Sequence, residues 1–333
     1  MELRKDPITM SWVILEDAEE STAKVDRCPL CPGNETAQTI YSFPYDHPEW
    51  QVRVTPHPHP LYSIEGDAQR RGEGLYDKMR NVGAHEIIVE TRDHNLPLCR
   101  QSDENVAQVL HAYVARLADL KRDRRFRYIT VFRNQGGLAG QDLAHPHSEV
   151  TATPFIPRRV AYELRASQRY FALKERCLIC DIIKQELTQQ VRTVDCDGQY
   201  VAFCPFASRV PYETWVLPVY HHAQFEEGVN SAENEMRLAR FLKGILQRLE
   251  STTSAYHLVL HTSPNTTARF EHAGAWQTLA EDYHWHFEIL PVIASKSKPY
   301  SLKEVYYNSL SPETAAKELR SARAAESAGK LQG

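Results

Sequence analysis

The sequence has no long hydrophobic run. No apolar stretch approaches the roughly 18 residues that a membrane-spanning helix needs. The opening residues, MELRKDPITMSWVIL, also lack the apolar core and the small-residue cleavage site of a secretory signal peptide. We therefore expect no membrane partner and a cytoplasmic location.

The sequence also lacks a large excess of charge of either sign. Its 39 Lys and Arg residues against 43 Asp and Glu residues give a net charge of −4. This small negative balance provides no attraction for the phosphates of nucleic acids, so no nucleic-acid partner is expected. The hydrophobic content of 42% and the charged content of 25% are ordinary for a globular protein. A length of 333 residues suits one large or two medium domains.

Cysteines are few, and their number, seven, is odd. They include two Cys-x-x-Cys pairs, Cys28 with Cys31 and Cys177 with Cys180. This usage favours metal binding in a reducing compartment over a disulfide framework. The first pair precedes a Pro-Gly turn, which can present two thiolates to one zinc ion. A thioredoxin-type redox pair is the alternative, but that motif opens a helix after a strand.

Residues 134–149, NQGGLAGQDLAHPHSE, carry more chemistry than any other stretch of the chain. They follow a β-branched and aromatic run at 128–132 that predicts a strand. The glycines that come next, among them Gly136 and Gly140, allow the backbone to approach a ligand closely. Backbone N–H groups in such a loop can hold phosphate oxygens.

Two histidines and a glutamate, His145, His147 and Glu149, follow this loop at alternate positions. Alternate positions of an extended segment share one face, so these side chains are expected to project together near the loop. An imidazole beside backbone N–H groups suits attack on a phosphoryl group. The alternative is that each histidine is a hydrogen-bonded structural residue.

The second half of the sequence repeats features of the first in the same order, which indicates an internal duplication. The repeated features are Cys-x-x-Cys at 28–31 and 177–180, a strand ending in His94 and in His221, a helix capped by Ser102 and by Ser231, a strand at 128–132 and at 256–260, and His-x-His-x-Glu at 145–149 and 284–288. Both predicted helices carry acidic residues in the first turn, where the helix dipole favours them.

The duplication sorts the candidate metal ligands into two sets of two cysteines and two histidines. The sets are Cys28, Cys31, His94 and His145 in the first half, and Cys177, Cys180, His221 and His284 in the second. Four nitrogen and sulfur ligands close a tetrahedral zinc site, so both sites are expected to be structural. His222 competes with its neighbour His221 as a ligand. His147 is then left free for chemistry.

These residues carry a resemblance to the galactose-1-phosphate uridylyltransferase family of the histidine-triad superfamily. The similarity is greatest to the two-zinc type that includes plant ADP-glucose phosphorylase. It begins at residues 4–14 (RKDPITMSWVI), continues through CPLCPGNE at 28–35 and HPH at 145–147, and ends at 284–291 (HWHFEILP). The match covers most of the chain, and the HPH motif is specific.

The resemblance implies roles for particular residues. His145 matches the zinc ligand of the HPH motif, and His147 matches the nucleophile that becomes a covalent nucleotidyl-histidine. The expected substrate-binding residues are Asn134, Gly136, Gly140, Asp142 and His286. A competing set for the second metal consists of Glu163, His261, His284 and His286, but the Cys-Leu-Ile-Cys pair favours the Cys₂His₂ set.

Several departures from the family pattern concern the substrate. Glu149 stands where the family has a glutamine that donates to phosphoryl oxygens. Asp142 stands where the family commonly has a serine, near the end of the glycine-rich loop. Residues 16–20 are acidic where an arginine-rich stretch is usual. The family's Pro-Asn-x-Phe-Pro appears as PHPHP at 56–60, and KPY at 298–300 lies near the expected sugar-binding segment. These changes make galactose 1-phosphate a poor candidate for the substrate.

Two carboxylates that face a phosphate repel it unless they are protonated or bridged by a cation. Glu149 therefore implies a divalent cation, a protonated side chain, or a substrate without a phosphate at that point. We favour the cation, because Asp142 supplies a second carboxylate. Glu149 is expected to act with His147 in catalysis, by orienting the ring or by binding through the cation.

Three functions are compatible with these residues. The first is a nucleotidyltransferase or nucleotide phosphorylase that acts on a nucleotide sugar or dinucleotide through His147. The second is a nucleotide hydrolase on the same scaffold, with Glu149 or Asp142 as general base. The third is a non-catalytic, zinc-stabilised binding protein.

The expected fold is α+β and consists of duplicated, histidine-triad-like half-barrels, with antiparallel sheets and long helices packed on them. The N-terminal half is predicted to span residues 1–157 and the C-terminal half residues 158–323, followed by a tail at 324–333. By analogy with the family, a homodimer is expected.

Overall fold

The computed structural model describes residues 1–16, 27–35, 37–268, 276–293 and 305–329. Most of the acidic stretch, at residues 17–20, and KPY at 298–300 lie outside the described residues. Among the residues that are described, no helix has both the length and the apolar character needed to cross a membrane.

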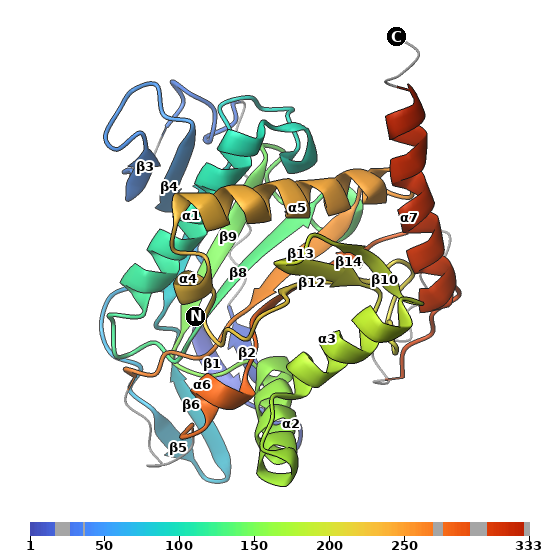
Figure 1. Cartoon of the computed structure of the whole chain (residues 1–333). Coiled ribbons are helices and arrows are strands. Elements are labelled where there is room, and N and C mark those ends of the chain that lie inside the picture. Colours follow the sequence, from blue (N-terminus) through green and yellow to red (C-terminus); the bar gives the residue numbers. More distant parts are fainter. Residues whose placement is uncertain (17–26, 36, 269–275, 294–304, 330–333) are drawn as a thin grey trace.

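One antiparallel sheet of ten strands forms the centre of the molecule (Figure 1). In spatial order, its strands are β3 (Tyr41–Phe43), β4 (Val52–Pro56), β7 (Ala84–Val89), β9 (His147–Thr153), β8 (Tyr128–Gln135), β13 (Tyr256–His261), β14 (His286–Pro291), β12 (Thr214–Pro218), β11 (Tyr200–Phe203) and β10 (Thr193–Cys196). The order reads as two matching series that meet where β8 pairs with β13. The predicted duplication is therefore visible in the sheet itself.

The predicted α+β class is confirmed, with large antiparallel sheets and helices packed on them. The two halves share a single open sheet, and the described strands form no closed barrel. The boundary expected at residue 157 falls between β9 and the next helix, α2 (Arg158–Lys174).

Two long helices, α1 (Asp103–Leu120) and α5 (Ala232–Glu250), lie side by side across one face of the sheet (Figure 1). Each begins after the predicted serine, because Ser102 accepts from the N–H of Asn105 at 3.1 Å and Ser231 from that of Asn234 at 3.2 Å. Their apolar stripes belong to the largest core cluster of the protein. Burying each large apolar side chain contributes roughly 1.5–3 kcal/mol, so this face anchors the fold.

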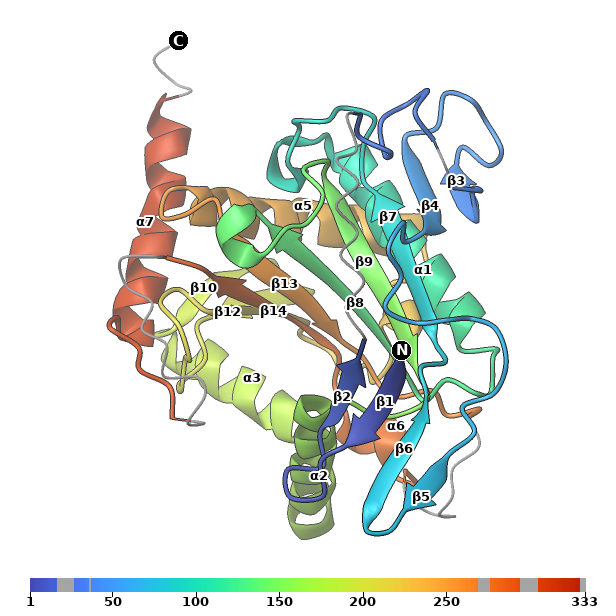
Figure 2. The ribbon, with the colours of Figure 1, turned by 180° about the vertical axis from the view of Figure 1, so that it is seen from behind.

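The opposite face of the sheet, seen in Figure 2, carries the remaining layers. Helix α3 (Leu178–Gln189) packs on β11 and β12 through Ile179 and Ile183. A second sheet consists of β2 (Trp12–Leu15), β1 (Glu2–Lys5), β6 (Tyr76–Arg80) and β5 (Arg71–Glu73). Helix α6 (Leu279–Asp282) contacts α2, and the 3₁₀ turn η2 (Gly137–Ala139) contacts β8 and β13. Helices α4 (Phe225–Gly228) and α7 (Pro312–Gly329) and the 3₁₀ turn η1 (Leu98–Arg100) instead contact α1 or α5 on the helix-covered face.

Three local details differ from what the sequence patterns suggest. Strand β7 ends at Val89 and β12 at Pro218, so His94 and His221 lie in the turns that follow. The second cysteine pair opens helix α3, with Cys177 at the N-cap, because no Pro-Gly turn follows it. Helix α7 continues to Gly329, past the position where a tail was expected to begin.

A buried ion pair on the helix-covered face holds the strand that carries His147. Arg133 is 1% exposed and Glu90 is fully buried. The guanidinium of Arg133 donates to the carboxylate of Glu90 and, at 3.1 Å, to the backbone carbonyl of His147. Ser148 donates to the same carboxylate, so adjacent residues of β9 are both tied to this pair.

We predict that Arg133→Met destabilises the fold by about 3–5 kcal/mol, because it leaves the carboxylate of Glu90 buried without a cation. Urea denaturation measures this change. The control is Arg122→Met, since the side chain of Arg122 is 82% exposed and its ion pair contributes little. Equal effects of the two substitutions would contradict the prediction.

Candidate active site

The first predicted metal set comes together on the face of the sheet opposite α1 and α5. Ligand atoms of Cys28, Cys31, His94 and His145 all lie within 4.8 Å of one another. The Sγ atom of Cys31 is 3.3 Å from Nδ1 of His94 and 3.4 Å from Nδ1 of His145. The other ring nitrogen of His145 donates to the carbonyl of Thr91 at 2.7 Å, which leaves Nδ1 free to bind a metal.

The second set repeats this geometry. Cys177, Cys180, His221 and His284 also gather within 4.8 Å. The Sγ atom of Cys180 is 3.4 Å from Nδ1 of both histidines. Nε2 of His221 donates to Ala280 at 2.8 Å, and Nε2 of His284 donates to Pro218 at 3.0 Å.

Both sets fit a tetrahedral metal ion. Bond lengths of 2.3 Å to sulfur and 2.0–2.1 Å to nitrogen imply a sulfur-to-nitrogen separation of about 3.5 Å in a tetrahedron, close to the separations found. The histidine rings are also nearly perpendicular, at 84° in the first set and 85° in the second. The residues can therefore hold two metal ions, one in each half.

The structure separates the competing assignments for the second metal. His221 faces the cysteines, whereas His222 is absent from the cluster. His284 also joins the cysteines, while Glu163 and His261 gather elsewhere with His286 and Glu288.

The glycine-rich loop lies between β8 and β9 and contains η2. Gly136 has φ +81° and Gly140 has φ +73°, conformations that side-chain-bearing residues rarely adopt. The side chain of Gln141 closes the loop, accepting from the N–H of Gly136 at 2.7 Å and donating to Leu143 at 2.8 Å. The loop is therefore held in one shape next to the start of β9.

His147 begins β9 and is 2% exposed. Its Nδ1–H donates to the carbonyl of His145 at 2.7 Å, so Nε2 carries the free lone pair. His147 and Glu149 project from the same face of β9, as expected, and their ligand atoms lie within 4.8 Å of each other and of Asp142. His145, just before the strand, turns to the cysteines instead.

Asp142 approaches His147 from the loop. Its carboxylate lies 3.5 Å from Nε2 of His147 and 3.4 Å from Nε2 of His57. The contact with His147, followed by that with His57, holds the pKa of Asp142 far below its usual range. Burial disfavours the charged ring of His147, but the bonds to Asp142 and to the His145 carbonyl outweigh burial and raise the pKa of His147.

Asn134, expected to bind substrate, lies at the junction of the two halves. In the pairing of β8 with β13 it stands opposite His257. The Nδ1–H of His257 donates to the side-chain oxygen of Asn134 at 2.8 Å. The amide N–H₂ group of Asn134 is then the end that can donate to a ligand. Sequence reasoning missed His257, because nothing in the chain order predicts this strand register.

Comparison with known proteins agrees with this geometry. Residues 9–157 match the family described as galactose-1-phosphate uridyl transferase, N-terminal domain. ADP-glucose phosphorylase of Arabidopsis thaliana is 26% identical over 340 residues, covering 96% of this chain and 92% of that protein. Galactose-1-phosphate uridylyltransferase of Thermotoga maritima is 26% identical over 330 residues, covering 96% and 98%.

Solved structures agree over the same length. A uridylyltransferase structure superposes with a TM-score of 0.81 at 26% identity, covering 97% of this chain and 98% of the other. The crystal structure of the Arabidopsis thaliana ADP-glucose phosphorylase with bound ADP-glucose gives a TM-score of 0.76 at 27% identity, covering 96% and 98%.

Over almost its whole length, the chain is therefore similar to galactose-1-phosphate uridylyltransferases and to ADP-glucose phosphorylase. The expected enzyme class, a nucleotidyltransferase, is confirmed by these similarities. This chain has Glu149 where the family pattern has a glutamine. The structure gives Glu149 a partner that the sequence did not predict. Nε2 of His85 on β7 lies 2.8 Å from the Glu149 carboxylate.

The second half of the chain has a counterpart to the His147 site that differs in access. His286 also has Nδ1 directed to a carbonyl, that of His284, at 3.2 Å. Its ring is stacked between Trp215, at 4.9 Å, and His261, at 4.8 Å, and it is 1% exposed. Burial lowers the pKa of His286 to about 4. The structure thus places His286 in this closed cluster, apart from the group around His147.

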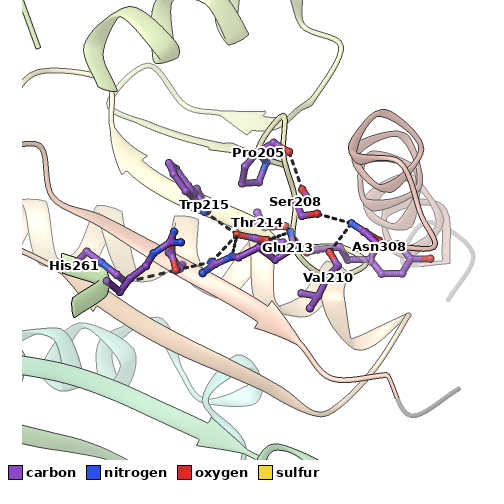
Figure 3. Close-up of polar contacts among 12 residues, drawn as sticks. Pro205, Ser208, Val210, Glu213, Thr214, Trp215, His261 and Asn308 are labelled. Atoms are coloured by element: carbon purple, nitrogen blue, oxygen red, sulfur yellow. Dashed lines mark hydrogen bonds and ion pairs between the residues drawn. The ribbon is translucent and has the colours of Figure 1, made fainter. Parts of the chain in front are cut away.

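Ion pairs fill the rest of the counterpart cluster. Glu288 accepts from Arg159 at 2.8 Å and from Arg209 at 2.6 Å. Figure 3 shows how the contacts of Glu213 and Trp215 connect this cluster to the segment around Ser208. Every carboxylate of this cluster, those of Glu163, Glu213 and Glu288, pairs with Arg159 or Arg209. We therefore interpret the cluster as a structural ion-pair network.

We predict that Gly136→Ala destabilises the protein by about 1–3 kcal/mol and lowers turnover, because a side chain is strained at this φ. The added Cβ would also lie 3.3 Å from Cβ of Ala255. Thermal denaturation and a nucleotidyl-transfer assay measure the two effects. The control is Gly137→Ala in the same loop, where no atom lies within 4 Å of the new Cβ. A control as damaging as Gly136→Ala would contradict the strain argument.

Proposed function

We propose that the protein transfers a nucleotidyl group from a nucleotide sugar or dinucleotide by a two-step route through His147. In the first step, Nε2 attacks the α-phosphorus and the sugar phosphate leaves with the electrons of the broken P–O bond. In the second step, an oxygen of an acceptor phosphate attacks the same phosphorus and releases His147. The observation that supports this route most is the bond from Nδ1 of His147 to the His145 carbonyl, which directs the Nε2 lone pair outward.

The other proposed site residues surround this nitrogen. The N–H groups near Gly136 and Gly140 and the amide of Asn134 would bind the phosphate oxygens. Ligand atoms of Asp142 and Glu149 lie within 4.8 Å of His147 and of each other, and each carboxylate is close to a further imidazole, that of His57 and of His85. Since the substrates named for the relatives are a nucleotide sugar and a hexose phosphate, a nucleotide sugar is the substrate we favour.

The two cysteine–histidine sets are proposed to hold structural zinc. Each set offers two thiolates and two imidazoles, which is a complete tetrahedral shell with no position for a substrate. Zinc in the first set would fix His145, and therefore the carbonyl that orients His147. A divalent cation that accompanies the substrate, between Asp142 and Glu149, stays a prediction that added magnesium can test.

A hydrolase is the second candidate, and one observation favours it. The carboxyl group of Glu149, within 4.8 Å of His147, would serve as the general base for water. A covalent intermediate that persists until phosphate is added supports the transferase, and one that decays in water alone supports the hydrolase. We also propose that the protein is a homodimer. Its seven free cysteines suit a reducing compartment, so we propose a cytosolic location.

We predict that wild-type protein mixed with ADP-glucose or UDP-glucose forms a phosphoramidate at His147, which intact-mass and peptide mass spectrometry detect. His147→Ala should abolish the adduct and lower turnover by several orders of magnitude while both metals stay bound. His145→Ala should instead lose metal. If His147→Ala retains the adduct, the nucleophile is a different residue.

We predict about two zinc ions per chain by elemental analysis. Cys28→Ser and Cys180→Ser should each remove one ion and lower the melting temperature, because metal binding contributes directly to folding. Cys196→Ser is the matched control, since Cys196 is exposed and outside both sets. Unchanged zinc content in Cys180→Ser would remove the second site from the assignment.

A further inference from the structure

Two histidines that the proposed mechanism does not use form a buried stack beside the nucleophile. The rings of His57, just after β4, and His85, on β7, are 4.1 Å apart and within 8° of parallel. Both residues are nearly buried, at 6% and 5% exposure. His85 comes from β7, the neighbour of β9, and His57 follows β4, the next strand beyond β7.

Backbone hydrogen bonds fix the tautomer of each ring. Nδ1 of His57 accepts the N–H of His59 at 3.0 Å, and Nδ1 of His85 accepts the N–H of Leu61 at 3.0 Å. A nitrogen that accepts cannot carry hydrogen, so the ring proton is on Nε2 in both residues. The pair therefore presents N–H donors at Nε2.

These donors face the two carboxylates of the site. Nε2–H of His85 donates to Oε2 of Glu149 at 2.8 Å. Nε2 of His57 lies 3.4 Å from Asp142, which is long for a hydrogen bond. His85 therefore orients the carboxyl group of Glu149 through one oxygen and leaves the other, Oε1, for a ligand.

The orientation of Glu149 makes its neutral form equivalent to a glutamine. A glutamine amide has one acceptor oxygen and one donor N–H₂ group. A neutral carboxylic acid whose Oε2 accepts from His85 has its donor, O–H, at Oε1. An ionised carboxylate can only accept, and so it would repel a phosphoryl oxygen.

A phosphate bound beside Glu149 would meet two carboxyl groups in a largely buried site. The residue is 8% exposed, and an oxygen of Asp142 lies within 4.8 Å of one of its own. The titratable groups around it are His85 from β7, His57 from the segment after β4, Asp142 from the loop and His147 from β9. On the flanking strands it stands opposite two apolar residues, Ile87 and Phe132. A phosphate would add a further negative charge.

We propose that Glu149, positioned by His85, binds the substrate phosphate as a neutral carboxylic acid, so that the site takes up one proton when a nucleotide sugar binds. The proton comes from solvent and is held at Oε1, where the O–H donates to a phosphoryl oxygen. This inference rests on the proposed function, because it places the phosphate next to His147. It makes His85 a positioning residue for substrate binding.

The test is calorimetric titration of ADP-glucose and UDP-glucose into the His147→Ala protein, in buffers of different ionisation enthalpy. That protein cannot form the covalent bond, and these ligands carry no phosphate group that titrates near neutral pH. We expect uptake of about one proton and an affinity that falls about tenfold per unit of rising pH. Adding Glu149→Gln should abolish the proton uptake and make the affinity for the nucleotide sugar independent of pH.

His85 is tested in the same background. His85→Gln can still donate an N–H to Glu149 and should retain much of the proton uptake, whereas His85→Phe should lose it. Equal binding and equal uptake by the two variants would overturn the positioning role. Circular dichroism and zinc content check that each variant is folded.

Two other outcomes would overturn the proposed proton uptake by Glu149. Binding without uptake means that Glu149 stays ionised, and binding that requires magnesium assigns the charge balance to a cation at Asp142 and Glu149. These results are separable from failure of the proposed function, which appears as the absence of labelled His147 in wild-type protein. If neither nucleotide sugar binds to the folded variant, both proposals are wrong.

Discussion

The chemistry of this site depends on hydrogen bonds between histidine rings and the backbone. In His145, His221 and His284, Nε2–H donates a hydrogen bond to a backbone carbonyl, so Nδ1 faces the thiolates. In His147, Nδ1–H donates to a backbone carbonyl instead, so Nε2 faces the glycine-rich loop. In His85 a backbone N–H occupies Nδ1, so the ring becomes a fixed donor. The backbone group that each imidazole meets thus decides whether its free nitrogen suits metal binding, nucleophilic attack or hydrogen-bond donation.

The duplicated halves show how far these roles can separate. Both keep a cysteine–histidine set with nearly identical geometry, so each half retains residues that can hold a metal ion. The surroundings of His147 and of its counterpart His286 have diverged. In the first half the ring stands beside a glycine-rich loop, whereas in the second it is stacked between Trp215 and His261. The second half still contributes to the first-half site through His257, whose hydrogen bond orients the side chain of Asn134.

Much of this arrangement was predictable from the sequence. The duplication, the capped helices and both cysteine–histidine sets follow from spacing and order, because repeated motifs must fold into repeated units. The contact between His85 and Glu149 was not predictable. It depends on the register of β7 against β9, and a shift of one residue would turn His85 to the other face. The choice between His221 and His222 likewise depends on how a turn after β12 is shaped, which spacing alone leaves open.

The pairing of β8 with β13 has a consequence for how such a chain could have arisen. It is the seam between the halves, and it joins equivalent strands of each in antiparallel register. A single half made alone would present β8 as an unpaired edge, which invites another copy to pair with it. Two identical copies meeting edge to edge would form a symmetric dimer with one continuous sheet and two equal sites. Gene fusion of such a dimer would free one copy to lose its reaction while still completing the sheet of the other.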